Sequence, residues 1–201
     1  AIASYAMGAT VAYNYIRGEF IDEPVPRFKE AVREAYDNGY LGKNIKDSGI
    51  DFDLHTFVGA GAYICGEETA LLESLEGKQG KPRFKPPFPA NYGLYGKPTT
   101  INNTQSLASV PSIIRKGADW FRELGVENSG GTAQFSVSGH IEKPGNYELP
   151  MGIPFKDLLS ICGGMLGGRK LKAVIPGGSS CPVMPAEVIL NCTMDYDSLK
   201  N

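Results

Sequence analysis

Two neighbouring acids behind a glycine-rich segment are the residues best suited to chemistry. Residues 59–77 read GAGAYICGEETALLESLEG, with glycine at positions 59, 61 and 66 and the acids Glu67 and Glu68 directly after them. Glycine lets a backbone approach a ligand closely, and the free amides of a helix start can bind an anionic or polar group. The spacing differs from the G-x-G-x-x-G dinucleotide fingerprint, and glycine-rich turns often serve only tight packing. These residues alone favour ligand binding and simple packing about equally.

The glycine segment is expected to join a strand to a helix. Apolar or β-branched residues alternate with polar ones at positions 52, 54, 56 and 58, which predicts a strand. Glu67 and Glu68 then fall at a helix start, where acids favour the helix dipole, and Gly77 follows the last helical residue.

Two more helices are predicted before this strand. The first residues, AIASYAMGATVAYNYIRGEF, place alanine and aromatic residues at helical spacings as far as Ile16, which predicts a helix buried on more than one side. A domain rarely starts inside such a helix, so we expect a truncated chain. The second helix is predicted from Pro26 to Tyr40, closed by Asn38 and Gly39.

Residues 78–100, KQGKPRFKPPFPANYGLYGKPTT, are rich in proline, glycine and lysine and predict neither a helix nor a central strand. A long loop inside a compact domain is usually functional or disordered, and the aromatic residues here argue against disorder. The following INNTQSLASVPSIIRKGADWF predicts a helix with Asn102 or Asn103 as its N-cap and a break at Pro111.

A second unit is predicted after residues 129–131. AQFSVSGHI alternates strongly, and the turn at residues 144–146 leads back into YELPMG, which predicts a hairpin. PFKDLLSICGG is typical of a short helix ended by Gly163 and Gly164, and LKAVIPGGSS of a further strand and turn. Together these elements predict a small α+β module.

The composition excludes several function classes. The chain is 42% hydrophobic and 21% charged with a formal charge of −2, which gives no reason to expect nucleic acid or an anionic membrane surface as a partner. No apolar run approaches the roughly 18 to 20 residues that span a bilayer. The spacings of Cys65, Cys162, Cys181 and Cys192 support no metal or cluster site, and we predict no metal ligands in this chain.

Longer motifs resemble one protein family. GAGAYICGEETALLES looks like the signature of the flavoprotein subunit of respiratory complex I, and EGKQGKPRFKPPFP followed by GKPTTINN continues the same family sequence. SVSGH, PGNYELPMG and AVIPGGSS are also similar, so the resemblance covers essentially all 201 residues. It implies an α/β fold, with a Rossmann-like FMN-binding domain over residues 1–128 and a small α+β, ubiquitin-like β-grasp module over residues 129–201.

The resemblance implies hydride transfer from NADH to FMN and single-electron transfer into iron–sulfur clusters. Such a site needs positioning more than proton chemistry, so no residue is nominated as a general acid or base. The residues implied for FMN are Tyr63, Gly66, Glu67, Ile101, Asn102, Asn103 and Ser106. Without the resemblance, helix capping would be the favoured role of the two asparagines.

For NAD(H), the resemblance implies cofactor contact by Glu68, charge or hydroxyl interaction by Lys85 and adenine stacking by Phe88. An acid can accept ribose hydroxyls, a lysine can face pyrophosphate and an aromatic ring can stack on a base. The alternatives are a helix-dipole acid, a solvated lysine and a loop-anchoring core aromatic. Cys65 is interpreted as a small apolar filler near the flavin.

The sequence departs from the family pattern in two ways. INNTQS stands where INNVET is usual, so Gln105 and Ser106 replace a glutamate and a threonine. The family's early GRGGAGFP loop and its late ESCGxCxPCRxG motif, which holds a 4Fe–4S cluster, are not in these residues. The chain is therefore expected to be inactive alone.

The implied partners are NADH and other subunits of the complex I peripheral arm, especially the 24 kDa-type iron–sulfur subunit. The implied location is peripheral, on the cytoplasmic face of the bacterial inner membrane or the mitochondrial matrix side. Flavoprotein subunits of NAD-reducing hydrogenases and NAD-dependent formate dehydrogenases share the signature and are the nearest alternatives. A fragment that acts only in binding or docking is a third.

Overall fold

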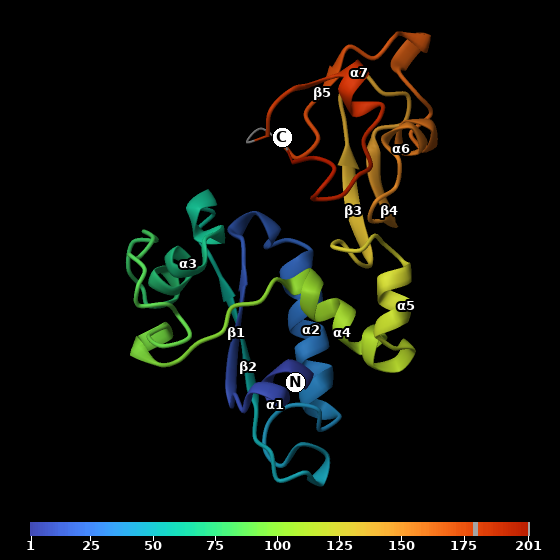
Figure 1. The fold of residues 1–201 in the computed structure, drawn as a ribbon. Helices are drawn as coiled ribbons and strands as arrows, with labels where there is room; N and C mark the ends of the chain where they lie inside the picture. Colours follow the sequence, from blue (N-terminus) through green and yellow to red (C-terminus); the bar gives the residue numbers. More distant parts are fainter. Residues whose placement is uncertain (179–180, 201) are drawn as a thin grey trace. The chain divides into compact units, whose positions relative to one another are not determined.

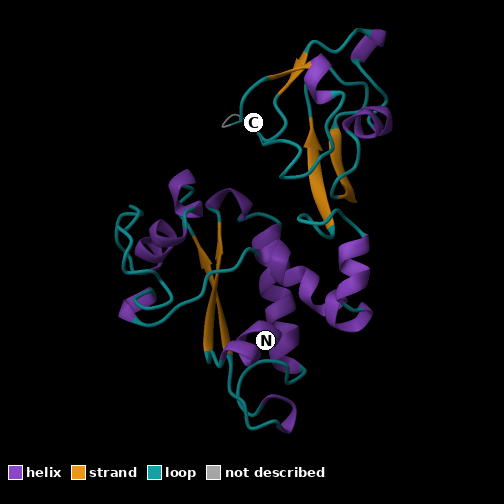
Figure 2. Ribbon diagram, viewed as in Figure 1, coloured by secondary structure: helices purple, strands orange, loops and turns teal. Residues whose placement is uncertain are grey.

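The computed structural model describes residues 1–178 and 181–200, which form two compact units. The first unit runs from Ala1 to Val110 and the second begins at Pro111. Helices and strands alternate in the first unit, and short strands and helices make up the second (Figures 1 and 2).

A pair of parallel strands organises the first unit. β1 (Val11–Ile16) pairs with β2 (Asp53–Val58) so that Val11 lies opposite Asp53 and Ile16 opposite Val58. Parallel neighbours need a crossover connection. Here it contains η1 (Gly18–Phe20), α2 (Pro24–Asp37) and η2 (Ile45–Asp47). The carboxyl ends of both strands therefore meet at one edge, which is where open α/β sheets bind ligands.

The prediction of one helix as far as Ile16 is wrong. α1 (Ile2–Met7) ends at Gly8, whose φ of 71° is left-handed, and residues 11–16 form β1. The sequence VAYNYI alternates, and its aromatic rings pair across the ladder: Tyr15 stacks on Phe57 with ring centroids 5.4 Å apart. Cross-strand pairing, which local spacing does not show, decides this segment.

α2 confirms the helix predicted from Pro26, although it starts two residues earlier, at Pro24, and ends at Asp37. The Tyr36 hydroxyl donates to Asp53 Oδ1 at 3.0 Å and accepts the Leu54 amide at 3.1 Å. The Tyr36 hydroxyl thus connects α2 to the start of β2.

The strand, glycine loop and helix predicted around residue 59 are confirmed. β2 is followed by η3 (Tyr63–Gly66) and α3 (Glu68–Leu75), and Gly77 follows with a φ of 76°. Ala70 and Leu72 are buried and anchor α3. The next residues form the predicted loop, whose only regular piece among the described residues is η4 (Leu94–Gly96).

Pro111 does not break a helix as predicted. α4 (Thr104–Lys116) contains it, and α5 (Ala118–Glu123) follows after Gly117. A proline removes one amide donor, but bonds beyond it can continue the helix, as the Gly117 amide does to the Ile113 carbonyl at 2.8 Å.

The second unit confirms the predicted hairpin and short helix. β3 (Thr132–Val137) pairs antiparallel with β4 (Gly145–Pro150), and α6 (Phe155–Ile161) follows. After η5 (Leu166–Gly168), β5 (Ala173–Val174) pairs with β6 (Met184–Pro185), which leads into α7 (Ala186–Ile189). The predicted strand is β5, and Ser179 and Ser180 of its predicted turn lie outside the described residues. The buried core comprises Ile141, Phe155, Leu158, Cys162, Met184, Ile189 and Met194.

Candidate functional site

The glycines of the loop after β2 serve different purposes. A Cβ on Gly59 would lie 2.2 Å from the Tyr15 hydroxyl oxygen, so this glycine is needed for packing of the strand ends. Gly61 has a φ of 90°, which glycine adopts without strain. A Cβ on Gly66 would meet no protein atom within 4 Å. Packing therefore explains Gly59 and backbone conformation explains Gly61, whereas Gly66 borders open space.

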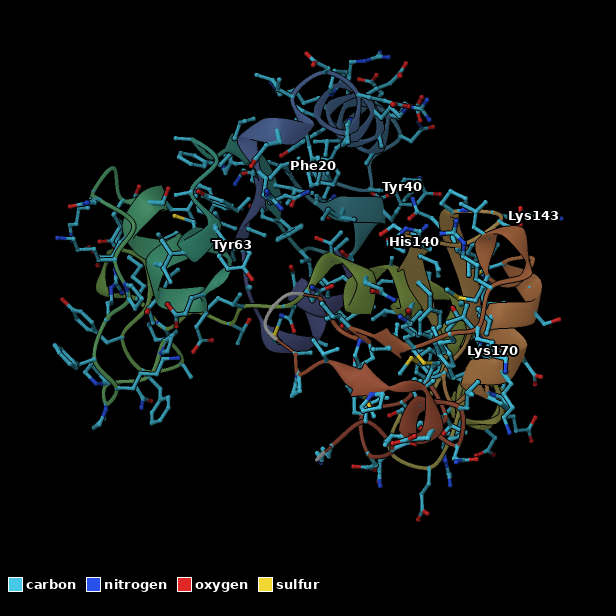
Figure 3. All side chains as sticks on the ribbon, turned by 90° about the horizontal axis from the view of Figure 1, so that it is seen from above. Phe20, Tyr40, Tyr63, His140, Lys143 and Lys170 are labelled. Carbon is cyan, nitrogen blue, oxygen red and sulfur yellow. The ribbon has the colours of Figure 1, made fainter. Side chains whose placement is uncertain are left out.

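A cavity of about 470 Å³ opens beside this loop. Its size is within the ordinary range of small-molecule sites. Tyr63, which is labelled in Figure 3, lies beside it. The residue is 88% exposed. The lining residues are Tyr15, Arg17, Gly61, Ala62, Tyr63, Ile64, Cys65, Gly66, Glu67 and Leu71. Three of the residues predicted for FMN, Tyr63, Gly66 and Glu67, thus line one cavity.

Glu67 is the N-cap of α3. Its Oε2 accepts the amides of Thr69 at 2.9 Å and Ala70 at 2.8 Å, and the Thr69 hydroxyl at 2.6 Å. Burial acts to raise the pKa of Glu67, but these hydrogen bonds and one from Lys85 outweigh it and lower the pKa. The carboxylate is therefore ionised, and its second oxygen faces Lys85.

Lys85 brings the long loop to the start of α3. Its Nζ donates to Glu68 Oε1 and lies 3.4 Å from Glu67 Oε1. The hydrogen bond to Glu68 is the main cause of a raised pKa for Lys85. Glu67, predicted for FMN, and Glu68 and Lys85, predicted for NAD(H), thus form one charged cluster.

The Phe88 backbone carbonyl holds this part of the loop. It accepts the amides of Asn91 at 2.9 Å and Tyr92 at 3.0 Å, which folds the loop into a turn. The residue is 54% exposed. That exposure argues against a core role for Phe88 in the described chain.

The INN segment caps α4. Asn103 Oδ1 accepts the Gln105 amide at 2.8 Å, which confirms Asn103 as the N-cap. Asn102 and Ser106 are exposed and Ile101 is half-buried. None of the predicted INN-segment residues is among the described residues that line the 470 Å³ cavity.

Tyr15 and Arg17 also line the cavity, and neither is among the predicted site residues, because the sequence predicts a helix as far as Ile16. The Arg17 guanidinium lies 2.7 Å from the Glu19 carboxylate. The signal was available in the alternation of VAYNYI followed by Arg17 and Gly18, which is typical of a strand that ends in a turn.

Neither a metal centre nor a membrane-spanning helix is present among the described residues. Within residues 1–178 and 181–200, no group of three or more His, Cys, Asp or Glu side chains is arranged to hold a metal ion. No helix in the same ranges is long and apolar enough to cross a membrane.

The fold defines a two-unit α/β protein with its candidate site at the carboxyl ends of parallel strands. Residues 1–112 match the family described as the Nuo51 FMN-binding domain, and residues 134–183 match the SLBB domain. The chain therefore belongs to the Nuo51 FMN-binding domain family. This confirms the resemblance to the complex I flavoprotein subunit and the expected α/β fold with a second module.

Curated relatives agree with this assignment. The F subunit of the NADH-quinone oxidoreductase of Rickettsia bellii (strain OSU 85-389) is 55% identical over 201 residues, which cover 99% of this chain and 48% of that protein. The F 1 subunit of the NADH-quinone oxidoreductase of Rhizobium meliloti (strain 1021) is 56% identical, over 99% of this chain and 46% of that protein. The chain spans about half the length of the curated relatives it matches.

A solved structure is also similar. The crystal structure of NAD+-reducing NiFe-hydrogenase in the H2-reduced state matches with a TM-score of 0.83 and 36% sequence identity. The match covers 99% of this chain and 33% of that one.

Glu76, which caps the end of α3, should make the stability of the protein depend on pH in the acid range. Burial acts to raise the pKa of Glu76, but hydrogen bonds from Lys78, the Tyr95 amide and Arg83 outweigh it and lower the pKa to about 2. The stabilisation from the ionised group is present above the unfolded pKa near 4.5 and is lost as the pH falls through about 2. Glu76→Gln should therefore lower the free energy of unfolding most above pH 5, and the difference from the wild-type protein should shrink toward pH 2. Urea unfolding of both proteins across this pH range measures that difference. A difference that does not change with pH would contradict the lowered pKa of Glu76.

Proposed function

We propose that this chain supplies part of the FMN and NADH site of a longer flavoprotein subunit. That longer protein would accept hydride from NADH onto FMN and pass electrons to iron–sulfur clusters, as an NADH:quinone oxidoreductase of the complex I type. The observation that carries the proposal is the Glu67–Glu68–Lys85 cluster beside the glycine-loop cavity, in a chain of this family. A 4Fe–4S cluster would be held by residues outside this chain.

The residues present fit FMN. A Cβ on Gly66 would meet no protein atom within 4 Å, so a ligand can approach the backbone here, and the adjacent cavity is lined by polar and aromatic residues. We assign Tyr63, Gly66 and Glu67 to one wall, with Ile101, Asn102, Asn103 and Ser106 as a second. Bound FMN supplies the conversion of two-electron to one-electron transfer. The chain's own task is to position the flavin and exclude other oxidants.

The residues assigned to NAD(H) are Glu68, Lys85 and Phe88. Glu68 Oε1 is already engaged by Lys85, so a ribose hydroxyl or pyrophosphate would enter a preformed charged pair. The exposed Phe88 ring is free to stack on adenine. The chain's residues thus hold NADH at both its ribose–phosphate and adenine parts.

The same proposal extends to assembly. We infer that the longer protein joins the complex I peripheral arm, with the 24 kDa-type iron–sulfur subunit as its neighbour, on the cytoplasmic face of the bacterial inner membrane or the matrix side in mitochondria. We also retain residues 1–128 as the FMN and NADH domain and residues 129–201 as the β-grasp module.

A second candidate function has an observation in its favour. The similarity to the NAD+-reducing hydrogenase suits a flavoprotein that serves hydrogenase or formate dehydrogenase partners. The higher identity to the F subunits of NADH-quinone oxidoreductases favours the complex I assignment. Purification of the native assembly separates them, since NADH:quinone activity supports the first and NAD-dependent hydrogen or formate oxidation the second. A preparation without flavin would instead support the docking alternative.

The full-length protein should bind FMN non-covalently, because the glycine loop and INN segment offer no flavin-linking His or Cys in a recognisable setting. Acid precipitation should release all of the flavin, measured by absorbance of the supernatant. Flavin that stays with the precipitated chain would overturn this expectation.

Variants should separate the two groups of residues. Glu67→Ala or Asn103→Ala in the full-length protein should weaken FMN retention, whereas Lys85→Ala should mainly raise the KM for NADH. Flavin content and steady-state kinetics are measured on each variant. Loss of flavin from Lys85→Ala with unchanged NADH kinetics in the remaining holoenzyme would show that Lys85 is misassigned.

Phe88→Ala tests the adenine contact. Prolines on both sides restrict the backbone, so the ring is held ready to stack at little entropic cost. Base–aromatic stacking is worth about 1 to 3 kcal/mol, so NADH affinity should fall roughly 5- to 150-fold. FMN content and melting temperature should change little. Unchanged affinity with a large drop in melting temperature would return Phe88 to a core role.

A further inference from the structure

Arg83 attaches the loop that carries Lys85 to α3 and its C-cap. Its Nε donates to Glu73 Oε1 at 2.5 Å, within α3, and its Nη2 donates to Glu76 Oε1 at 2.7 Å, on the residue that caps the end of α3. Its Nη1 donates to the Gly93 carbonyl at 3.0 Å, which closes residues 83–93 into a ring. The Arg83 side chain is only 20% exposed, whereas that of Arg27, which pairs on the surface, is 78% exposed.

The backbone of the same residue reaches the other end of α3. The Arg83 amide donates to the Thr69 hydroxyl oxygen at 2.8 Å, and that hydroxyl donates to Glu67 Oε2 at 2.6 Å. Thr69 is only 2% exposed, so water does not readily replace either bond. A continuous chain of hydrogen bonds thus links the proposed FMN acid Glu67 to the backbone two residues before Lys85.

This chain of hydrogen bonds affects the position of the Lys85 ammonium. Among the described residues of the long loop, only Lys85 forms an ion pair with the Glu67 and Glu68 carboxylates. Its side chain has several rotatable bonds, so the ammonium position depends on where residue 83 holds the backbone. Loss of the Thr69 hydroxyl would leave Glu67 its two amide donors, and the cap of α3 would persist.

We propose that Thr69 and Arg83 are positioning residues for NADH binding, which hold the Lys85 ammonium in register with Glu67 and Glu68. This inference rests on the proposed function. Thr69 makes the link through its hydroxyl, and Arg83 through its amide and its three guanidinium contacts. Neither residue is among those assigned to direct contact with NADH, which are Glu68, Lys85 and Phe88.

Thr69→Val tests the link with little change of shape. In the FMN-loaded full-length protein, the KM for NADH should rise roughly 5- to 30-fold, on the scale of lost hydrogen bonds in a charged network. The kcat should stay within about twofold and the flavin content should not change. Thr69→Ser should restore the KM, because it returns the hydroxyl. Arg83→Lys keeps the positive charge but loses the planar guanidinium with its several N–H donors, so it should also raise the KM.

A double-variant cycle tests the route through Lys85. In the Lys85→Ala background, Thr69→Val should cause no further rise in KM, because the group that it positions is gone. Thr193→Val is the matched control: its hydroxyl also donates to a carboxylate, that of Asp195 at 2.5 Å, but in the second unit. That control should leave the KM unchanged.

The outcomes separate the inference from the proposed function. A wild-type protein that carries FMN and oxidises NADH, with an unchanged KM in Thr69→Val, overturns only the positioning role. Equal KM effects of Thr69→Val with and without Lys85 overturn it as well. A wild-type protein with neither flavin nor NADH oxidation overturns both.

Discussion

The cap of α3 by Glu67 is the interaction on which the rest of the candidate site depends. One carboxylate oxygen ends the glycine loop and begins the helix, because it accepts two backbone amides and the Thr69 hydroxyl. The first amides of a helix otherwise have no intrahelical partner. The path of the loop past Gly66 and the start of α3 are thus fixed by the same group, and its second oxygen is directed toward Lys85.

Charge pairs take the place of secondary structure in the proline-rich loop. Because of their proline and glycine content, residues 78–100 cannot form the regular backbone hydrogen bonds of a helix or sheet, so polar contacts to α3 must hold the segment. Acids at both ends of the helix meet basic residues of the loop: Glu68 meets Lys85, and Glu73 and Glu76 meet Arg83. An apolar aromatic can then remain exposed on the loop while its backbone stays ordered.

Close backbone packing joins the loop to the cavity wall. A Cβ on Gly80 would lie 2.4 Å from Cys65 Sγ, so the loop needs glycine where it passes behind the cavity. Cys65 is 6% exposed, which agrees with its interpretation as a small filler. The long loop therefore packs against Cys65, a residue that lines the cavity.

The sequence by itself determined the elements whose signals are local. The alternation before Val58, the acids at 67 and 68, Gly77 and the hairpin of the second unit are all read from neighbouring residues, and the family motifs indicated the family and a candidate site. Tertiary structure alone decided that residues 11–16 form a strand and that α4 continues through Pro111. It also decided that Lys85 meets Glu67 and Glu68 from 18 and 17 positions away, and that Arg83 reaches Thr69. Pairing across a sheet and between a loop and a helix depends on which segments meet in space, and no local period of the sequence encodes that.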